Sequence, residues 1–335
     1  MLKFYFPVIL VAVLAIGRFM FACVLLGNRC EEEPQPPELP ALNLIRVSSI
    51  DIVDRNFPSP HSELLLGMLI GLDRLGEVPY FSEALKNTST IHVVVVSGFN
   101  IALVFGLITK LLGSEYRISN LLIAQLFTIF YALLSGFEPP VVRALVMGSI
   151  VAWGKYSGRL IDGFRVLIFA ASIMVLFEPW YLTSVSFQLS FAASSGLILF
   201  SKVFKGMKVP EDLKSTLSAQ LLVWPIISFY FGKVSLIGIL VNPLILWTVS
   251  ISTVLGGIYV LAGFIFPALS EIFSVLLYPF LDVFFRVVMF FGAFKGTTIN
   301  AKINLLWLIV YYLLLILFLG IHNKRKGPTN EIKNR

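Results

Sequence analysis

The stretch IHVVVVSGFNIALV, residues Ile91–Val104, decides the fold class of this chain. It is apolar enough to enter a lipid bilayer, yet His92, Ser97, Gly98 and Asn100 all fall within its first ten residues. A polar group in hydrocarbon costs several kcal/mol unless it is paired or hydrated. We therefore expect this polar face to meet water or other polar side chains.

The composition indicates an integral membrane protein. Of 335 residues, 57% are hydrophobic and 13% are charged, whereas soluble domains carry about 25% charged residues. The apolar stretches are long and continuous, so we expect helical spans and not the strands of an outer-membrane barrel. The two cysteines, Cys23 and Cys30, do not make a disulfide framework, and we expect no bridge between them. Three scattered histidines show no metal-ligand spacing, so no metal or other cofactor is expected.

Hydropathy predicts an all-α fold with about ten transmembrane helices, and the first run is too long for the core of a signal peptide. The expected spans are 4–27, 92–112, 118–135, 140–157, 162–177, 182–204, 215–231, 246–266, 270–294 and 303–321. The apolar run from Ser235 to Phe266 is too long for one simple span and contains Asn242-Pro243. Because proline removes a helical hydrogen bond, we expect a short re-entrant helix there, followed by a full span.

The placement of charge predicts the orientation of these spans. With the N-terminus inside, lysines and arginines concentrate in the cytoplasmic loops and the tail, and the short outer loops carry few of them. Both termini are therefore expected in the cytoplasm, and most of the net charge of +7 is explained without nucleic acid. The predicted parts are a membrane anchor (1–27), an extracytoplasmic proline-rich linker (28–57), a membrane domain (58–321) and a basic cytoplasmic tail (322–335).

The longest segment outside the membrane, 28–90, is expected on the outer side. Within it, Asn43–Val53 mixes β-branched and polar residues and is compatible with one short strand. His61–Leu72 and Pro79–Leu85 are predicted to be amphipathic helices that lie at the outer interface. Nothing outside the membrane is long enough for an enzymatic domain.

Polar side chains recur in the outer half of four or five predicted spans. Besides those of the opening stretch, they are Arg143, Ser186, Gln188, Ser190, Ser194 and Asn242. Each alone has an ordinary explanation, because arginines near helix ends extend toward water and helical serines bond their own backbone. Together they favour a hydrated cavity or a pore entrance.

A catalytic interpretation is weaker. Ser97 and His92 suggest a hydrolase, but five residues apart on a helix they point about 140° apart. No carboxylate lies nearby in the sequence to orient the histidine. The run Gly148–Lys155 (GSIVAWGK) resembles a phosphate loop only superficially, because its glycine spacing is too long and Tyr156 replaces Ser or Thr. We expect no ATP-binding machinery in this chain.

Five blocks of the chain resemble the membrane domain of the ComEC-type competence proteins. In order, they are PSPHSELLLGMLIGLDR, LKNTSTIHVVVVSGFNIALV, LSGFEPPVVRALVMGSIV, FEPWYLTSVSFQLSFAASSGLIL and SLIGILVNPLILW. The resemblance covers about residues 58–293 and implies an inner-membrane channel through which bacteria import single-stranded DNA during natural transformation. Arg143, Gln188 and Asn242 match polar positions of the family, and Asn100 stands where the family usually has a second histidine.

Larger members of that family carry two further modules. One is an OB-like domain, for which 28–57 is too short, and the other is a C-terminal nuclease-like domain, whose metal motif is not found before Arg335. The resemblance therefore implies a channel domain alone. Its implied partners are single-stranded DNA, membrane lipids, a cytoplasmic ATP-driven helicase or translocase, an extracytoplasmic DNA receptor and a separate nuclease. The oligomeric state stays open.

We therefore expect a bacterial inner-membrane channel with a polar path and no catalytic residues. The residues expected to line this path are His92, Ser97, Gly98, Asn100, Arg143, Ser186, Gln188 and Asn242. Two alternatives remain open at this point. One is a channel or transporter for a small solute or lipid on the same helical scaffold, and the other is the intramembrane hydrolase.

Overall fold

The computed structural model of the chain describes residues 11–20, 23, 39–94, 96–113, 117–201, 203–204, 207–294, 296 and 298–325. Its elements, in chain order, are α2 (Pro40–Asn56), α3 (His61–Ile70), η2 (Leu75–Glu77), α4 (Pro79–Asn87), α5 (Ile91–Val94), α6 (Gly98–Leu111), α7 (Ile118–Leu134), α8 (Pro139–Tyr156), α9 (Gly163–Phe177), η3 (Pro179–Leu182), α10 (Val185–Phe200), α11 (Glu211–Phe231), β1 (Lys233–Ser235), α12 (Gly238–Ile265), α13 (Pro267–Gly292), β2 (Thr298–Asn300) and α14 (Leu305–Arg325). The predicted all-α fold class is confirmed.

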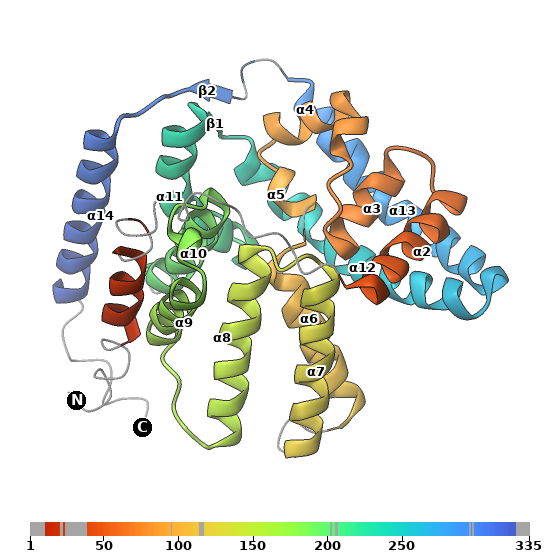
Figure 1. Cartoon of the computed structure of the whole chain (residues 1–335). Coiled ribbons are helices and arrows are strands. Elements are labelled where there is room, and N and C mark those ends of the chain that lie inside the picture. Colours follow the sequence, from red (N-terminus) through yellow and green to blue (C-terminus); the bar gives the residue numbers. More distant parts are fainter. Residues whose placement is uncertain are drawn as a thin grey trace.

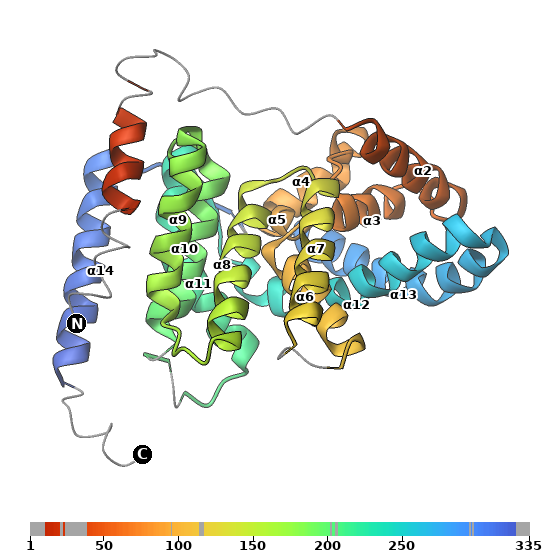
Figure 2. The same cartoon turned by 60° about the horizontal axis from the view of Figure 1, so that its bottom comes forward.

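Two groups of helices make up the structure. Helices α6 to α11 run up and down beside one another, and α14 lies along the edge of this group (Figure 1). The hairpin of α12 and α13 packs with α2, α3 and α4 to one side, where it crosses the direction of the first group (Figure 2). A short antiparallel ribbon joins β1 to β2, with Val234 opposite Ile299. This ribbon connects α11 to the segment that leads into α14.

Four helical segments are long and apolar enough to cross a membrane: Ile91–Leu111, Gly238–Ile265, Pro267–Gly292 and Leu305–His322. Shorter apolar helices accompany them, among them Ile118–Leu134, Gly163–Phe177 and Val185–Phe200. The chain is therefore a membrane protein, and the expected number of about ten spans stays a prediction. Cys23 takes part in a disulfide, so the expectation of no bridge was wrong.

Helix α3 forms the centre of the larger core. The expectation that it lies at the outer interface was therefore wrong. All ten of its residues are buried, including Leu64, Leu65 and Met68. A helix that is apolar on all sides gains most when neighbours surround it completely. Close approach makes this burial complete, because a Cβ at Gly256 of α12 would lie 2.8 Å from a methyl carbon of Leu65. Helix α4 keeps the expected two-sided character, with Phe81, Ala84 and Leu85 buried.

The expected strand at Asn43–Val53 is wrong, because these residues belong to helix α2. The buried residues of α2 are Leu42, Ser49, Ile52 and Val53, and their spacing follows the period of a helix. Its last turn is held by Tyr259 of α12, whose hydroxyl donates to the Ile52 carbonyl at 2.5 Å. Packing of this face on α3 and α12 outweighs the preference of β-branched residues for strands.

The break in a helix lies elsewhere than predicted. Helix α12 runs without interruption from Gly238 to Ile265 and contains Pro243 in its second turn. So close to the helix start, proline removes one internal hydrogen bond without ending the helix. The non-helical residues are instead Val96 and Ser97, which separate α5 from α6. The polar stretch that opens the sequence analysis is therefore itself the broken segment.

A second internal proline explains how α14 attaches to the bundle. Pro225 within α11 has no N–H for the carbonyl of Leu221, four residues earlier. The Tyr311 hydroxyl of α14 donates to that carbonyl at 2.9 Å, and the Tyr312 hydroxyl donates to the Leu222 carbonyl at 2.6 Å. Since a bilayer offers no water to an orphaned carbonyl, the Tyr311 hydroxyl satisfies the carbonyl that Pro225 leaves unpaired, and the Tyr312 bond adds a second link between α14 and α11.

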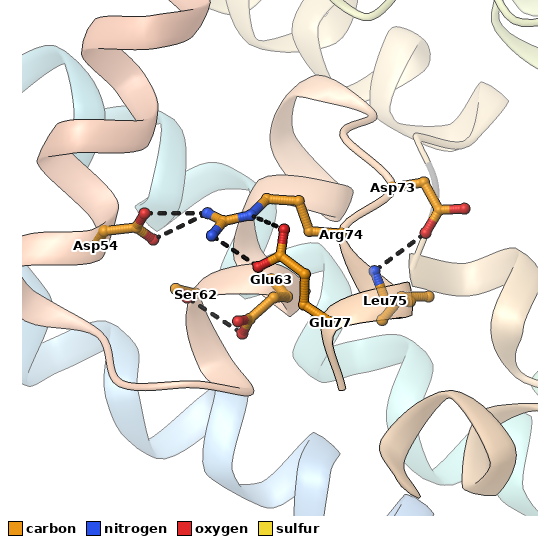
Figure 3. A network of polar contacts seen from close by, with 7 residues as sticks. All are labelled: Asp54, Ser62, Glu63, Asp73, Arg74, Leu75 and Glu77. Carbon is orange, nitrogen blue, oxygen red and sulfur yellow. Dashed lines mark hydrogen bonds and ion pairs between the residues drawn. The ribbon is translucent and has the colours of Figure 1, made fainter. Parts of the chain in front are cut away.

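The group that contains α2 and α3 carries a network of ion pairs and hydrogen bonds centred on Arg74 (Figure 3). The guanidinium donates to both carboxylate oxygens of Glu77, at 3.0 and 2.9 Å, and its Nη1 reaches Asp54 of α2 at 3.0 Å. The hydrogen bond from Arg74 holds the pKa of the Glu77 carboxyl below its usual value. This network ties the end of α2 to the turn that contains η2.

Replacement of Tyr311 tests the role of the proline in α11. We expect Tyr311→Phe to lower the free energy of unfolding by about 0.5–2 kcal/mol, because it leaves a carbonyl unpaired in an apolar environment. In a Pro225→Ala background the cost should shrink, since alanine supplies the missing N–H. Denaturation of the protein in mild detergent measures both values, with the exposed Tyr230→Phe as the control. Equal costs in the two backgrounds would contradict this explanation.

The Arg74 network predicts a dependence of stability on pH. The pKa of Glu77 is lowered on folding, so its contribution is complete above the ordinary value of 4.5 and is lost as the pH falls through the lowered value. We expect Glu77→Gln to reduce the drop in melting temperature between neutral and acidic pH. Exposed Glu83→Gln is the matched control and should leave that drop unchanged. An unchanged drop in the Glu77 variant would exclude a contribution from this pair.

Candidate functional site

Helices α6 and α8 come unusually close together at Gly98, the first residue of α6. A Cβ at this position would lie 2.9 Å from Nη2 of Arg143, 3.0 Å from Cβ of Ala144 and 3.1 Å from the carbonyl oxygen of Pro140. Contacts this short leave no room for a side chain. Glycine at 98 therefore brings the backbone of α6 directly against the guanidinium of Arg143.

Arg143 is partly buried and is held by neutral groups. Its Nε donates to the hydroxyl of Ser190 on α10 at 2.8 Å, and its Nη1 lies 3.7 Å from the sulfur of Met147. Within the described ranges, no carboxylate forms an ion pair with it. A charge removed from water without a counter-ion is costly. An anion beside Arg143 would lower this cost.

The start of α6 adds to this positive character. Ser97 occupies the N-cap position, but its side chain makes no capping hydrogen bond. The N-terminus of a helix carries a partial positive charge and exposes backbone N–H groups. Because Gly98 lies against Arg143, a helix terminus and a guanidinium face the same region. The start of α6 and Arg143 are therefore two sources of positive charge that lie side by side.

The expected stripe of serines on α10 includes Ser190, the residue that Arg143 contacts. Ser190 and Ser194 are both buried, and the Ser194 hydroxyl donates to the Ser190 carbonyl at 2.9 Å. Ser186 precedes them by one turn and is partly buried. Gln188 is held apart from the arginine, because its Nε2 donates to the Leu182 carbonyl at 2.9 Å in the turn before α10.

Asn100 lies away from the arginine and contacts α3. Its exposed fraction is 2%, and its Nδ2 donates to the carbonyl of Met68 at 2.9 Å. That carbonyl belongs to the last turn of α3, where backbone acceptors lack partners within the helix. The hydroxyl of Tyr131 interacts with the Asn100 side chain, in a geometry that leaves the hydroxyl and Oδ1 without a full hydrogen bond. Asn100 thus joins α6 to the core around α3.

His92 and Asn242 gather around a second place, the turn at Ser89. The side chain of His92 hydrogen-bonds the Ser89 backbone. Asn242 is 5% exposed, and its Oδ1 has no hydrogen-bond partner among the described residues. Gly238 lies between Ser89 and Asn242, because a Cβ there would be 3.1 Å from the Ser89 side chain and 3.9 Å from Nδ2 of Asn242. The eight sequence-predicted residues therefore do not form one cluster.

Arg143 and the stripe of serines can be picked out from the sequence, but the bond between Arg143 and Ser190 cannot. Spacing along one helix shows which serines share a face, but it does not show which face meets α8. Among the residues that the structure describes, no group of three His, Cys, Asp or Glu side chains suits a metal ion. His92 lies in α5 and Ser97 lies in the non-helical break before α6, so the angle between them on one helix does not apply.

Comparison with known proteins places this geometry in a family. A model of the Competence protein family matches residues 73–326, which is most of the chain. The chain belongs to the competence protein family. It is 26% identical over 257 residues to ComE operon protein 3 of Bacillus subtilis, which covers 75% of this chain and 32% of that protein. It is also 26% identical over 196 residues to Competence protein ComA of Neisseria gonorrhoeae, which covers 54% of this chain and 28% of that protein.

A further relative is an uncharacterized protein of Aquifex aeolicus, 31% identical over 210 residues, which covers 62% of this chain and 49% of that protein. The chain thus spans about a third to a half of the length of these relatives. No solved structure matches this chain.

The contact at Gly98 gives a test of the site. We expect Gly98→Ala to lower stability by about 1–3 kcal/mol, because the new Cβ meets backbone and side-chain atoms that cannot all withdraw. Gly106→Ala on the same helix is the matched control, because a Cβ there has open space. It should be neutral or stabilising, since alanine favours helix more than glycine. Thermal unfolding in detergent compares the two, and equal stability would contradict the close approach of α6 and α8.

Proposed function

We propose that this protein is an inner-membrane channel for the import of single-stranded DNA during natural transformation. The observation that carries the proposal is Arg143, a partly buried cation without a carboxylate partner in the described ion pairs. It lies beside the uncapped start of α6, so two sources of positive charge face one region. A passing phosphodiester supplies the negative charge that this region lacks.

The anion at this site must bind and then leave. A guanidinium held by one serine and one thioether retains unused N–H donors for a phosphate. No protein carboxylate has to be displaced from it first. A site that is favourable but not saturated suits conduction, because cargo must enter and also depart. The buried serines below Arg143 on α10 supply neutral polar groups along the same wall.

The proposed path includes the residues that the sequence analysis assigned to it. They are His92, Ser97, Gly98, Asn100, Arg143, Ser186, Gln188 and Asn242. In this proposal the group at Arg143 attracts phosphate, and the group at Ser89, with His92, lies near the same outer end. Asn100 acts indirectly, since its bond to Met68 positions α6.

We place both termini in the cytoplasm. The turn between α7 and α8 and the connection between α8 and α9 lie at opposite ends of the bundle (Figure 1). The latter contains Arg159, and Lys155 ends α8 beside it, in agreement with positive charge on the cytoplasmic side. The disulfide at Cys23 supports an outer location for the end of the first apolar run, because disulfides persist in oxidising compartments.

Energy for transport has to come from partners in this proposal. A cytoplasmic ATP-driven helicase or translocase would pull the strand, and an extracytoplasmic receptor would deliver DNA to the outer end. A separate nuclease would remove the second strand. These partners follow from the proposed function and from membership in the competence family.

Replacement of Arg143 tests the proposal directly. We expect Arg143→Ala to reduce transformation by linear DNA about tenfold or more, because charge-assisted hydrogen bonds contribute about 1.5–3 kcal/mol. Arg143→Lys keeps the charge but not the planar donor group, so an intermediate loss is expected. The assay uses a naturally transformable host that lacks its own copy of this gene.

The control for this assay is Arg159→Ala, which removes an exposed arginine beyond the other end of α8. It should leave transformation unchanged, and immunoblots of membranes should show equal amounts of each variant. Normal transformation in an Arg143→Ala strain with normal protein levels would overturn the assignment.

A further inference from the structure

A cavity of about 200 Å³ opens at the outer end of α8, one turn above Arg143. Its walls come from the end of α3, the turn between α7 and α8, η3 and the side chain of Arg46 on α2. Pro139 lines it and precedes Arg143 by four residues, so both lie on the same face of α8. The cavity and the proposed phosphate site are therefore consecutive along one helix.

Two aromatic residues form one wall of this cavity. Trp180 and Tyr181 follow each other in η3, with ring centroids 5.7 Å apart. Tyr181 is also stacked on Phe187 of α10, at 5.7 Å between centroids and 16° between planes. That stack fixes the tyrosine in the protein core, whereas Trp180 is only partly buried. Trp180 thus lines the cavity with an aromatic side chain that is not fully enclosed by the core.

A planar cation forms another part of the wall. The Nε of Arg46 donates to the Leu134 carbonyl at 3.0 Å, and its Nη2 donates to the Leu133 carbonyl at 3.2 Å. These bonds satisfy the end of α7 and hold the guanidinium plane in place. They use two of five N–H donors, so further donors remain for a ligand. Gly136 opens the space beside this group, because a Cβ there would meet only Arg46, at 3.8 Å.

The charges around the cavity decide which ligand suits it. Glu138 lines the cavity, and the charges of Glu178 and Glu138 add to burial in raising the pKa of Tyr181 to about 12. A phosphate placed here would face the Glu138 carboxylate, and a simple cation would face Arg46. A neutral planar ring with hydrogen-bonding edges meets neither penalty. The volume is smaller than the roughly 300–1,000 Å³ of pockets for drug-sized ligands, so it suits one ring system.

We propose that this cavity binds one unpaired nucleobase of the incoming strand, stacked on Trp180 and contacted at its edge by Arg46. The inference rests on the proposed function, since it assigns a base to the position next to the phosphate at Arg143. Base stacking on an aromatic side chain accepts every base, so the cavity distinguishes single-stranded from double-stranded DNA without reading sequence. A base pair would not fit, because its bases are already stacked and paired.

The test compares strands with and without bases on the full chain in lipid nanodiscs. A thymidine strand of about ten nucleotides should bind about 5- to 150-fold more tightly than an abasic strand of the same length. In Trp180→Leu this ratio should fall several-fold, while affinity for the abasic strand stays unchanged. Trp153→Leu, at the other end of α8, is the matched control and should keep the full ratio. Irradiation of a strand that carries 5-iodouracil should attach it to Trp180 or Tyr181, as peptide mass spectrometry would show.

The outcomes separate this inference from the proposed function. The base pocket would be overturned if wild type and Trp180→Leu showed the same ratio of affinities for the thymidine and abasic strands, and if no strand became attached at η3. That result would not contradict the proposed channel. No binding of any strand by the wild-type protein would overturn both. A phospholipid headgroup that stays in the cavity and blocks attachment would identify the ligand as lipid and would also overturn the inference.

Discussion

The structure depends on a single constraint: the guanidinium of Arg143 must be held inside a membrane protein, although no carboxylate in the described part of the chain forms an ion pair with it. The bond from Arg143 to Ser190 ties α8 to α10, and the missing side chain at Gly98 lets α6 close on the same group. Three helices are thus arranged around one charge. A buried unpaired cation costs free energy, and that cost is offset when an anion arrives. In the proposed function, a phosphodiester supplies that anion.

The position of this site is set by the core around α3. Asn100 donates to the last turn of α3, and α3 is enclosed by α2, α12 and α13. Because the polar stretch is broken at Val96 and Ser97, α6 begins inside the structure with an uncapped end. If the helix were continuous, Ser97 and Gly98 would lie inside it, and no helix N-terminus would lie beside Arg143. Core packing and the break therefore together place the positive helix end beside Arg143.

Much of this arrangement could be predicted from the sequence, and the failures have physical causes. Composition and long apolar runs indicate helices in a membrane, and serine spacing indicates a polar face on α10. The helix at α2 was missed because its β-branched residues favour strands until a neighbouring helix covers them. Pro243 predicts a break, but a proline near the start of a helix removes only one hydrogen bond and does not end the helix. Contacts between distant segments, such as Arg143 with Ser190, have no signature in local spacing.

The central claim is tested most directly by measuring whether single-stranded DNA protects the start of α6 from a thiol reagent. Cys23 is disulfide-bonded and the described part of the chain has no free cysteine, so Ser97→Cys adds a distinct thiol at the start of α6. In proteoliposomes, we expect a membrane-impermeant thiol reagent to label this cysteine, and we expect single-stranded DNA to slow the labelling much more than double-stranded DNA. Labelling at the same rate with and without single-stranded DNA would contradict a path that passes Arg143.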